Sequence, residues 1–128
     1  MEGLELAKAI SEIILSKKGY DIKILDLQGI SSVADYFVIC SADSDIQVKA
    51  ITDEIEKKLR KQGIKPYNRE GTTTNTWVLL DYIDVVVHVF KHETRLHYSL
   101  EKLWGDAHTI EIKDEAEPQN TQENEEEE

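Results

Sequence analysis

Two aspartates, Asp43 and Asp45, follow an apolar segment and come just before a predicted helix. Paired carboxylates of this kind can hold a divalent metal, and Asp81 or Asp84 from a later segment is a candidate third ligand. Hard oxygen ligands suit magnesium and phosphoryl transfer, the chemistry of a metal-dependent nucleotidyltransferase. Helix capping and the helix dipole explain the same pair without a metal. No glycine-rich phosphate loop or basic phosphate clamp accompanies it, so capping is the favoured interpretation.

Three histidines, His88, His92 and His97, raise the question of a zinc site. They span a predicted strand end, a loop and a helix start, with no cysteine or second carboxylate at a zinc-ligand spacing. One histidine on a strand face and two on the surface, without a metal, are the favoured interpretation. The sequence also lacks the nucleophile-elbow motif that would support a Ser-His-Asp catalytic triad. We therefore expect no catalytic residue, no bound metal and no cofactor, and predict that the protein is not an enzyme.

The elements that position these residues centre on segment 77–90, where two apolar, β-branched runs flank a short polar break. This is the pattern of a β-hairpin. Alternation places Trp77, Leu79 and Asp81 on one face of the first strand, and Val78, Leu80 and Tyr82 on the other. Both faces are largely apolar, so one packs on the core and the other needs a helix, a second subunit or a partner to cover it. Trp77 is also explained as a half-buried core aromatic.

The turn of this hairpin carries an unusual residue. A two-residue turn at Tyr82 and Ile83 requires positive φ at one or both positions. Isoleucine resists positive φ because its branched Cβ clashes with the backbone. The sequence therefore predicts either a longer loop or local backbone strain.

The other segments predict helices and strands in the order α-β-β-α-β-β-β-α. The expected elements are a helix over 4–18, strands over 22–27 and 35–40, a helix over 44–62 ended by Gly63, a short strand over 64–70, the hairpin strands, and an apolar helical stripe at Leu96, Leu100, Leu103 and Trp104 ended by Gly105; 108–113 is expected to be a transition into the tail. This order predicts an α+β fold, a mixed sheet of about five strands flanked by helices. The connection through 44–62 is long enough to cross over to a parallel neighbour.

Charge divides the 128 residues into two parts. The net charge is −11, and residues 113–128 hold eight acidic side chains against Lys113, leaving −4 for residues 1–112. We expect one domain over 1–112 and a disordered acidic tail over 113–128. Such a charge disfavours direct binding to nucleic acid, which needs a basic surface, and is compatible with a basic protein partner.

Composition also indicates the cellular compartment. No apolar run is long enough to span a membrane, and the acidic N-terminus lacks the layout of a signal peptide. The single cysteine, Cys40, has no partner for an internal disulfide and lies in an apolar run, where we expect a buried, inert thiol. These features predict a cytoplasmic protein.

A larger set of residues resembles a known family. In order and at family-like spacing they are Leu25-Asp26-Leu27, Ser31-Ser32, Ala34 to Ile39, Gln47-Val48, Glu70-Gly71, Trp77 to Tyr82, Asp84 to His88, Tyr98, and Leu100 to Trp104. Over roughly residues 4–107 the chain resembles the Iojap family, the bacterial ribosomal silencing factors. The resemblance implies a fold related to nucleotidyltransferases without their catalytic centre.

The resemblance also implies a function. Members of the family are expected to bind the fourteenth protein of the large ribosomal subunit, on the face that meets the small subunit. Bound there, they block subunit joining and repress translation when nutrients are scarce. The residues implied in partner binding are Trp77 as anchor, Asp81, Tyr82, Asp84 and His88 beside it, and Glu70 and Gly71 at the rim. A homodimer that pairs the apolar sheet face is an alternative that can coexist with this function.

The chain departs from the family pattern at two places. It has Ser41-Ala42-Asp43-Ser44 where the family usually has Ser-Gly-Thr-Ser, and Ile83 where the family usually has glycine. The first departure adds carboxylates near the site that nucleotidyltransferases use, which keeps that alternative open. The second changes the residue expected in the hairpin turn and so affects the predicted turn geometry. The acidic tail is outside the resemblance, and we expect it to point away from the ribosomal subunit because RNA repels it.

Overall fold

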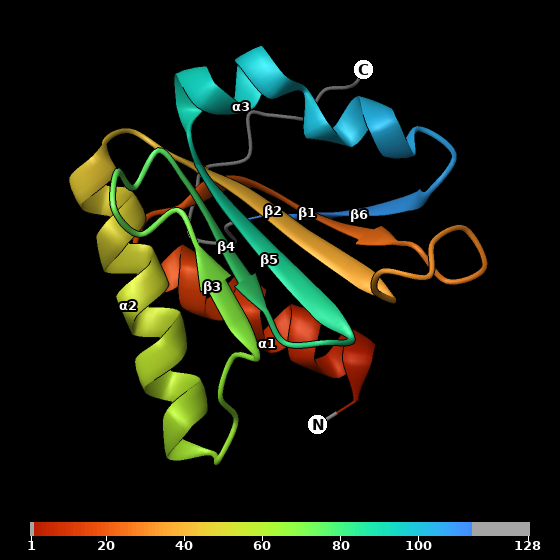
Figure 1. The fold of residues 1–128 in the computed structure, drawn as a ribbon, viewed down its shortest axis with the longest axis horizontal. Helices are drawn as coiled ribbons and strands as arrows, with labels where there is room; N and C mark the ends of the chain where they lie inside the picture. The colour runs from red at the N-terminus through yellow and green to blue at the C-terminus, as the bar shows by residue number, and fades with distance from the viewer. Residues whose placement is uncertain (1, 114–128) are drawn as a thin grey trace.

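A computed structural model describes residues 2–113, which form one mixed sheet with helices on both faces (Figure 1). The elements are α1 (Gly3–Ser16), β1 (Tyr20–Asp26), β2 (Tyr36–Ala42), α2 (Asp45–Lys61), β3 (Asn68–Glu70), β4 (Trp77–Asp81), β5 (Val85–Lys91), α3 (His92–Tyr98), the 3-10 helix η1 (Leu100–Trp104) and β6 (His108–Ile112). The strands lie in the order β3-β4-β5-β2-β1-β6. The α+β class predicted from the sequence is confirmed.

The centre of the sheet is a parallel pair. β2 pairs with β5 in parallel, whereas the β1–β2, β1–β6, β3–β4 and β4–β5 pairs are antiparallel. The hairpin formed by β4 and β5 is confirmed, and α2 lies in the connection that brings β5 beside β2, as its length predicted. The sheet has six strands where about five were predicted, because 108–112, predicted to be a transition into the tail, forms the edge strand β6 against β1.

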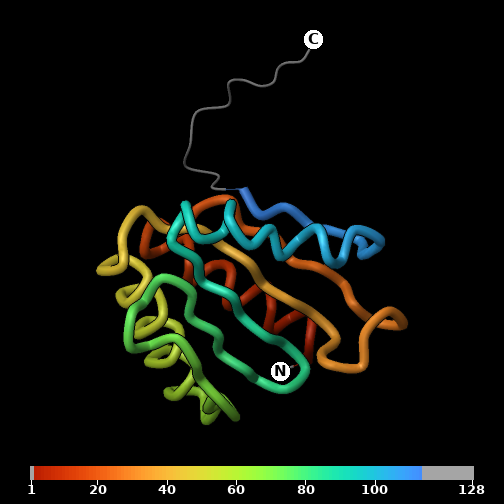
Figure 2. Tube along the Cα trace, turned by 45° about the horizontal axis from the view of Figure 1, so that its top comes forward, coloured from red at the N-terminus to blue at the C-terminus, as the bar shows by residue number. Residues whose placement is uncertain are grey.

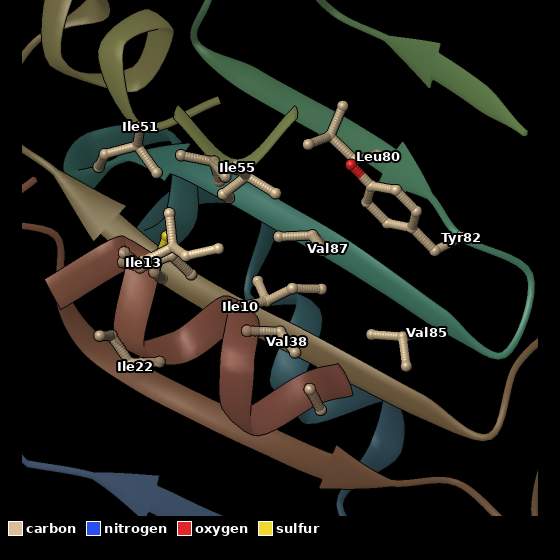
Figure 3. Packing of buried hydrophobic residues seen from close by; sticks show 14 of the residues in the cluster. Ile10, Ile13, Ile22, Val38, Ile51, Ile55, Leu80, Tyr82, Val85 and Val87 are labelled. Atoms are coloured by element: carbon tan, nitrogen blue, oxygen red, sulfur yellow. The ribbon is translucent and has the colours of Figure 1, made fainter. Parts of the chain in front are cut away.

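The first core lies between one face of the sheet and helices α1 and α2. Figure 3 shows Ile10 and Ile13 of α1 and Ile51 and Ile55 of α2 in this core, on the same side of the sheet as Val87 of β5. The thiol of Cys40 is fully buried in this core, as predicted, and burial raises its pKa to about 12. A buried thiol of this kind stays protonated and inert at neutral pH.

Local signals explain why α2 forms. The Ser44 hydroxyl accepts a hydrogen bond from the Gln47 backbone N–H at 3.1 Å, and Gln47 Oε1 accepts one from the Asp43 N–H at 2.7 Å. This arrangement satisfies backbone donors at the helix N-terminus, as the sequence predicted. At the other end Gly63 adopts φ of 78°, which glycine tolerates without a steric penalty.

The second face of the sheet is only partly covered. α3 and η1 cross it at one end, as Figure 2 shows, and the part formed by β3 and β4 carries no helix. The buried residues of this second core are Leu25, Leu27, Ala34, Phe37, Ile39, Val86, Phe90 and Leu100. Trp77 and Leu79 pack against this core while keeping part of their surface in solvent. The apolar face predicted to need a cover is therefore partly open.

The helical stripe expected from Leu96 to Trp104 was wrong. Ser99 adopts a left-handed conformation, with φ of 49°, which ends α3 and starts η1 in a different phase. As a result Leu100 is buried, while Leu96 and Leu103 are 65% and 73% exposed. A single irregular residue thus removes the three-to-four spacing on which the stripe depended.

Candidate functional site

The sheet register sorts the candidate residues by face. Leu79 lies between Glu70 of β3 and His88 of β5, and directly opposed residues share a face. Trp77 and Asp81 join that face by alternation along β4. The partly exposed members, Glu70, Trp77, Leu79 and Asp81, are called the β4 surface below. This surface lies on the face that carries α3.

Tyr82 does not share this surface. Its side chain is 8% exposed and lies in the first core, where Figure 3 shows it beside Leu80. Burial raises the pKa of its hydroxyl, with the negative charge of Glu56 as a second cause. The residue therefore contributes to the packing of α2 on the sheet.

Trp77 is surrounded by aromatic rings. Its ring stacks on Phe90 at a centroid distance of 4.8 Å and lies 5.0 Å from the ring of Tyr98. Its indole N–H donates a hydrogen bond to Nδ1 of His88 at 3.1 Å. These contacts hold the indole in one orientation, with part of its surface in solvent. A rigid, half-exposed aromatic side chain of this kind is typical of a binding anchor.

His88 supports this anchor from inside the sheet. It is 3% exposed, and desolvation lowers its pKa from 6.5 to about 4. Because Nδ1 accepts the Trp77 bond, the proton of the neutral ring sits on Nε2. That nitrogen is buried and has no hydrogen-bond partner within residues 2–113. The histidine therefore positions Trp77 and is not itself presented to solvent.

Gly71 lies where the chain passes close to the backbone of β4. A Cβ added at this position would lie 1.9 Å from the Trp77 carbonyl oxygen, and φ is +84°. Both facts require glycine here. Its role in the site is to let the β3–β4 connection approach Trp77, while the neighbouring Glu70 is exposed.

The hairpin turn combines the two predicted alternatives. Residues 82–84 lie outside the strands, and Ile83 has φ of 73° with its side chain 62% exposed. The Asp84 N–H donates to the Tyr82 carbonyl at 2.9 Å, closing a tight turn around Ile83. Asp84 is exposed, and its carbonyl accepts hydrogen bonds from the Asp35 and Tyr36 N–H groups at 2.9 and 3.0 Å. The turn is therefore anchored to the start of β2.

The outer members of the β4 surface are acidic. Glu70 is exposed and Asp81 is half-buried, and Asp84 is exposed in the adjoining hairpin turn. The nearest basic residue on β3, Arg69, points to the other face and pairs with Glu56 of α2 at 3.4 Å. The surface thus has an apolar centre with a negative border, which complements a basic protein surface.

Arg95 also shapes this face, although no pattern in the sequence pointed to it. Its side chain is buried, and its guanidinium donates to the Asp21 carbonyl at 2.6 Å and to Ser41 Oγ at 2.8 Å. Two further bonds, of 3.2 and 2.9 Å, reach the Glu101 carboxylate in a bidentate pair. The hydrogen bond from Arg95 is the main cause that lowers the pKa of Glu101. The sequence showed that Arg95 is a charged residue near a predicted helix, and nothing in it indicated that the side chain is buried.

The two aspartates that suggested a metal site accept hydrogen bonds from protein groups, and the rings of His92 and His97 lie near those of Tyr20 and Tyr98. Asp43 accepts a hydrogen bond from the Tyr20 hydroxyl at 2.8 Å, and Asp45 accepts one from the Ile46 N–H at 3.0 Å. Among the described residues no group of three or more histidine, cysteine or acidic side chains is arranged to hold a metal ion. No helix of this part is long and apolar enough to cross a membrane.

Fold and surface together define a small α+β protein with a rigid aromatic anchor on a partly open sheet face. A family model described as ribosomal silencing factor during starvation matches residues 1–128. The chain belongs to this family of ribosomal silencing factors.

Individual relatives support the same family membership. The chain is 44% identical to the ribosomal silencing factor RsfS of Halalkalibacterium halodurans over 112 residues, which cover 88% of this chain and 96% of the relative. It is 53% identical to the factor of the same name from Bacillus subtilis over 91 residues, covering 71% and 77%. A crystal structure of a Chromobacterium violaceum protein matches with a TM-score of 0.79 at 35% identity, covering 92% of this chain and 98% of that one.

A more distant relative is named for the ribosome as well. The mouse protein called mitochondrial assembly of ribosomal large subunit protein 1 is 30% identical over 95 residues. The match covers 72% of this chain and 42% of the mouse protein.

Proposed function

We propose that this protein binds the large ribosomal subunit through the β4 surface and sterically blocks joining of the small subunit. The partner on the subunit is its fourteenth protein, and the outcome is repression of translation in the cytoplasm under nutrient limitation. The protein acts by occupying a surface and needs no catalytic residue or cofactor. Family membership supports a ribosomal role, and the name of the mouse relative supports the large subunit.

The observation that carries the proposal is the Trp77 anchor within an acidic border. Trp77 is fixed by Phe90 and His88 and keeps part of its ring in solvent. Half-buried Leu79 continues the apolar centre. Binding energy at protein interfaces concentrates in such aromatic centres, and negative borders steer association with basic partners. Ribosomal proteins offer basic surfaces of this kind because they bind RNA.

The residues proposed to contact the partner are Trp77, Leu79, Asp81, Asp84 and Glu70. His88 and Gly71 act by holding Trp77 and the β3–β4 connection in place, and Tyr82 acts by packing on the opposite face. Of the acidic tail, residues 113–128, all but Lys113 lie outside the described residues. We propose that it points away from the subunit, and a tail deletion that abolished binding would contradict this.

The test is sedimentation of purified large subunits with wild type and variants. Wild type is expected to travel with the large subunit and to reduce joining when small subunits are added. Trp77→Ala is expected to weaken binding by at least about 30-fold, the loss typical of an interface hot spot. Ile46→Ala is the control, because Ile46 is 78% exposed at the start of α2.

Three outcomes would contradict the proposal. If wild type does not bind the large subunit, the proposed ribosomal role is wrong. If Trp77→Ala binds as well as wild type, the β4 surface is not the binding site. If wild type binds the large subunit but does not reduce its joining to the small subunit, the steric mechanism is wrong. Sedimentation of the free protein over a range of concentrations tests the homodimer, since a stable dimer through the same face would compete with the subunit.

A further inference from the structure

Helix α3 is attached to the sheet by a charged side chain. Among its seven residues only Arg95 is buried, whereas its apolar residues Leu96 and Tyr98 are 65% and 55% exposed. This reverses the usual arrangement, in which a surface helix buries its apolar side chains and exposes its charged ones. Burial of Arg95, together with the contact of the Tyr98 ring on Trp77, therefore attaches the helix to the sheet.

The buried guanidinium fixes the helix in a defined position. Arg95 bonds to the Asp21 carbonyl and the Ser41 hydroxyl, which belong to β1 and β2, and to Glu101 of η1. A planar, multiply bonded guanidinium restricts orientation more than apolar packing does. The left-handed Ser99 then ends the helix immediately after Tyr98.

Tyr98 is placed against the proposed docking surface by this arrangement. Its ring centroid lies 5.0 Å from that of Trp77, so the two rings form a continuous aromatic surface. Leu96 points elsewhere, because residues two apart on an α-helix differ by about 200° in direction. The two exposed apolar residues of α3 thus point in different directions, and the ring of Tyr98 is directed toward Trp77.

We infer that Tyr98 is a second aromatic anchor for the protein partner that covers Trp77, and that Arg95 is the positioning residue that holds it there. The inference rests on the proposed function and names a further part of the same surface. The partner contacted by Tyr98 is the basic, apolar surface of the large-subunit protein. Tyrosine suits this role because its ring buries apolar area while its hydroxyl keeps a polar contact.

The first test compares two variants of the same helix. Tyr98→Ala is expected to weaken binding to purified large subunits by at least about tenfold. Leu96→Ala, the matched control, is expected to stay within about twofold of wild type. In a Trp104→Phe background, Tyr98→Ala is also expected to shift the fluorescence of Trp77 to longer wavelength, because removing the ring exposes the indole to water.

The second test asks whether Arg95 acts through Tyr98. Arg95→Met is expected to weaken binding in the wild-type background and to add little in the Tyr98→Ala background. Circular dichroism and unfolding experiments establish that each variant is folded under the assay conditions. If Arg95→Met does not fold, Glu101→Gln weakens the same set of hydrogen bonds while keeping the guanidinium in place.

The outcomes separate this inference from the proposed function. If Trp77→Ala abolishes binding while Tyr98→Ala and Leu96→Ala both bind normally, the β4 surface stands and the second anchor is wrong. If the losses from Arg95→Met and Tyr98→Ala are additive, the positioning role of Arg95 is wrong. If wild type does not bind the large subunit, the proposed function and this inference both fail.

Discussion

The indole N–H of Trp77 and Nδ1 of His88 form a hydrogen bond of 3.1 Å between β4 and β5. The two residues are diagonal neighbours, since Trp77 pairs with Phe90 and His88 with Leu79. The bond requires a neutral histidine, because a protonated ring offers no acceptor. The orientation of the proposed anchor therefore depends on the protonation state of a buried side chain.

This dependence predicts a loss of stability in mild acid. The pKa of His88 is about 4 in the folded protein and 6.5 when solvated, so the unfolded state binds the proton first as pH falls. Stability is therefore full above pH 6.5 and is lost between pH 6.5 and 4, by about 2 kcal/mol between pH 7 and 5. Urea unfolding at these pH values measures it.

The control for this effect is His88→Asn. The asparagine side chain oxygen can accept the Trp77 bond and does not titrate, so this part of the pH dependence is expected to disappear even though the variant is less stable overall. An equally steep loss of stability in His88→Asn between pH 7 and 5 would assign the effect to other groups.

Arg95→Met is expected to lower the free energy of unfolding by about 3 kcal/mol. The change leaves the Ser41 hydroxyl and the Glu101 carboxylate without their main partner. Breaking a buried pair costs about 3–5 kcal/mol, and the partial exposure of Glu101, which also contacts Lys23, keeps the loss near the lower limit. Chemical denaturation measures this change in the free energy of unfolding.

Lys49→Met is the control, because it removes an exposed ion pair with Asp53 and should cost less than about 1 kcal/mol. Equal losses from the two variants would contradict the assignment of the Arg95 effect to buried hydrogen bonds.

Gly71→Ala is expected to destabilise the protein more than Gly29→Ala. Both glycines have positive φ, so both variants carry a backbone cost of about 1 kcal/mol. At Gly71 the new Cβ would also lie 1.9 Å from the Trp77 carbonyl oxygen, whereas at Gly29 no atom lies within 4 Å. Thermal unfolding of the two variants side by side compares these costs. Similar melting temperatures would show that the close approach to β4 relaxes easily.

Ile83→Gly is expected to stabilise the protein by about 1 kcal/mol. Ile83 adopts φ of 73°, which is unfavourable for a β-branched residue and free of steric cost for glycine. The side chain is 62% exposed, so little packing is lost. Equilibrium unfolding measures the change. A destabilised variant would show that the greater freedom of glycine in the unfolded chain outweighs the relieved strain.

Local patterns predicted the elements that depend on neighbouring residues. The alternation in 77–90 predicted the hairpin, and Ser44 with Gln47 predicted the start of α2; both are confirmed. The unusual turn was visible because a single residue type, isoleucine at position 83, conflicts with the required backbone.

Features that depend on distant residues were missed. β6 is short and acquires its structure by pairing with β1, near the other end of the described chain. The burial of Arg95 depends on the carbonyl of Asp21, which lies at an irregular point of β1 with φ of 49°. Likewise, the burial of His88 beneath Trp77 depends on the packing of Phe37 against it. Sequence spacing carries no signal for such contacts.

The position of β1 between β2 and β6 has a consequence for synthesis of the chain. Ile22 of β1 pairs with Ile112 of β6, near the other end of the described chain. The central pair joins β2 to β5, which are separated in the chain by α2, β3 and β4. Both pairings close long loops, and loops of this kind slow folding. The sheet can therefore be completed only after β6 has left the ribosomal exit tunnel, although five of its six strands lie earlier in the chain.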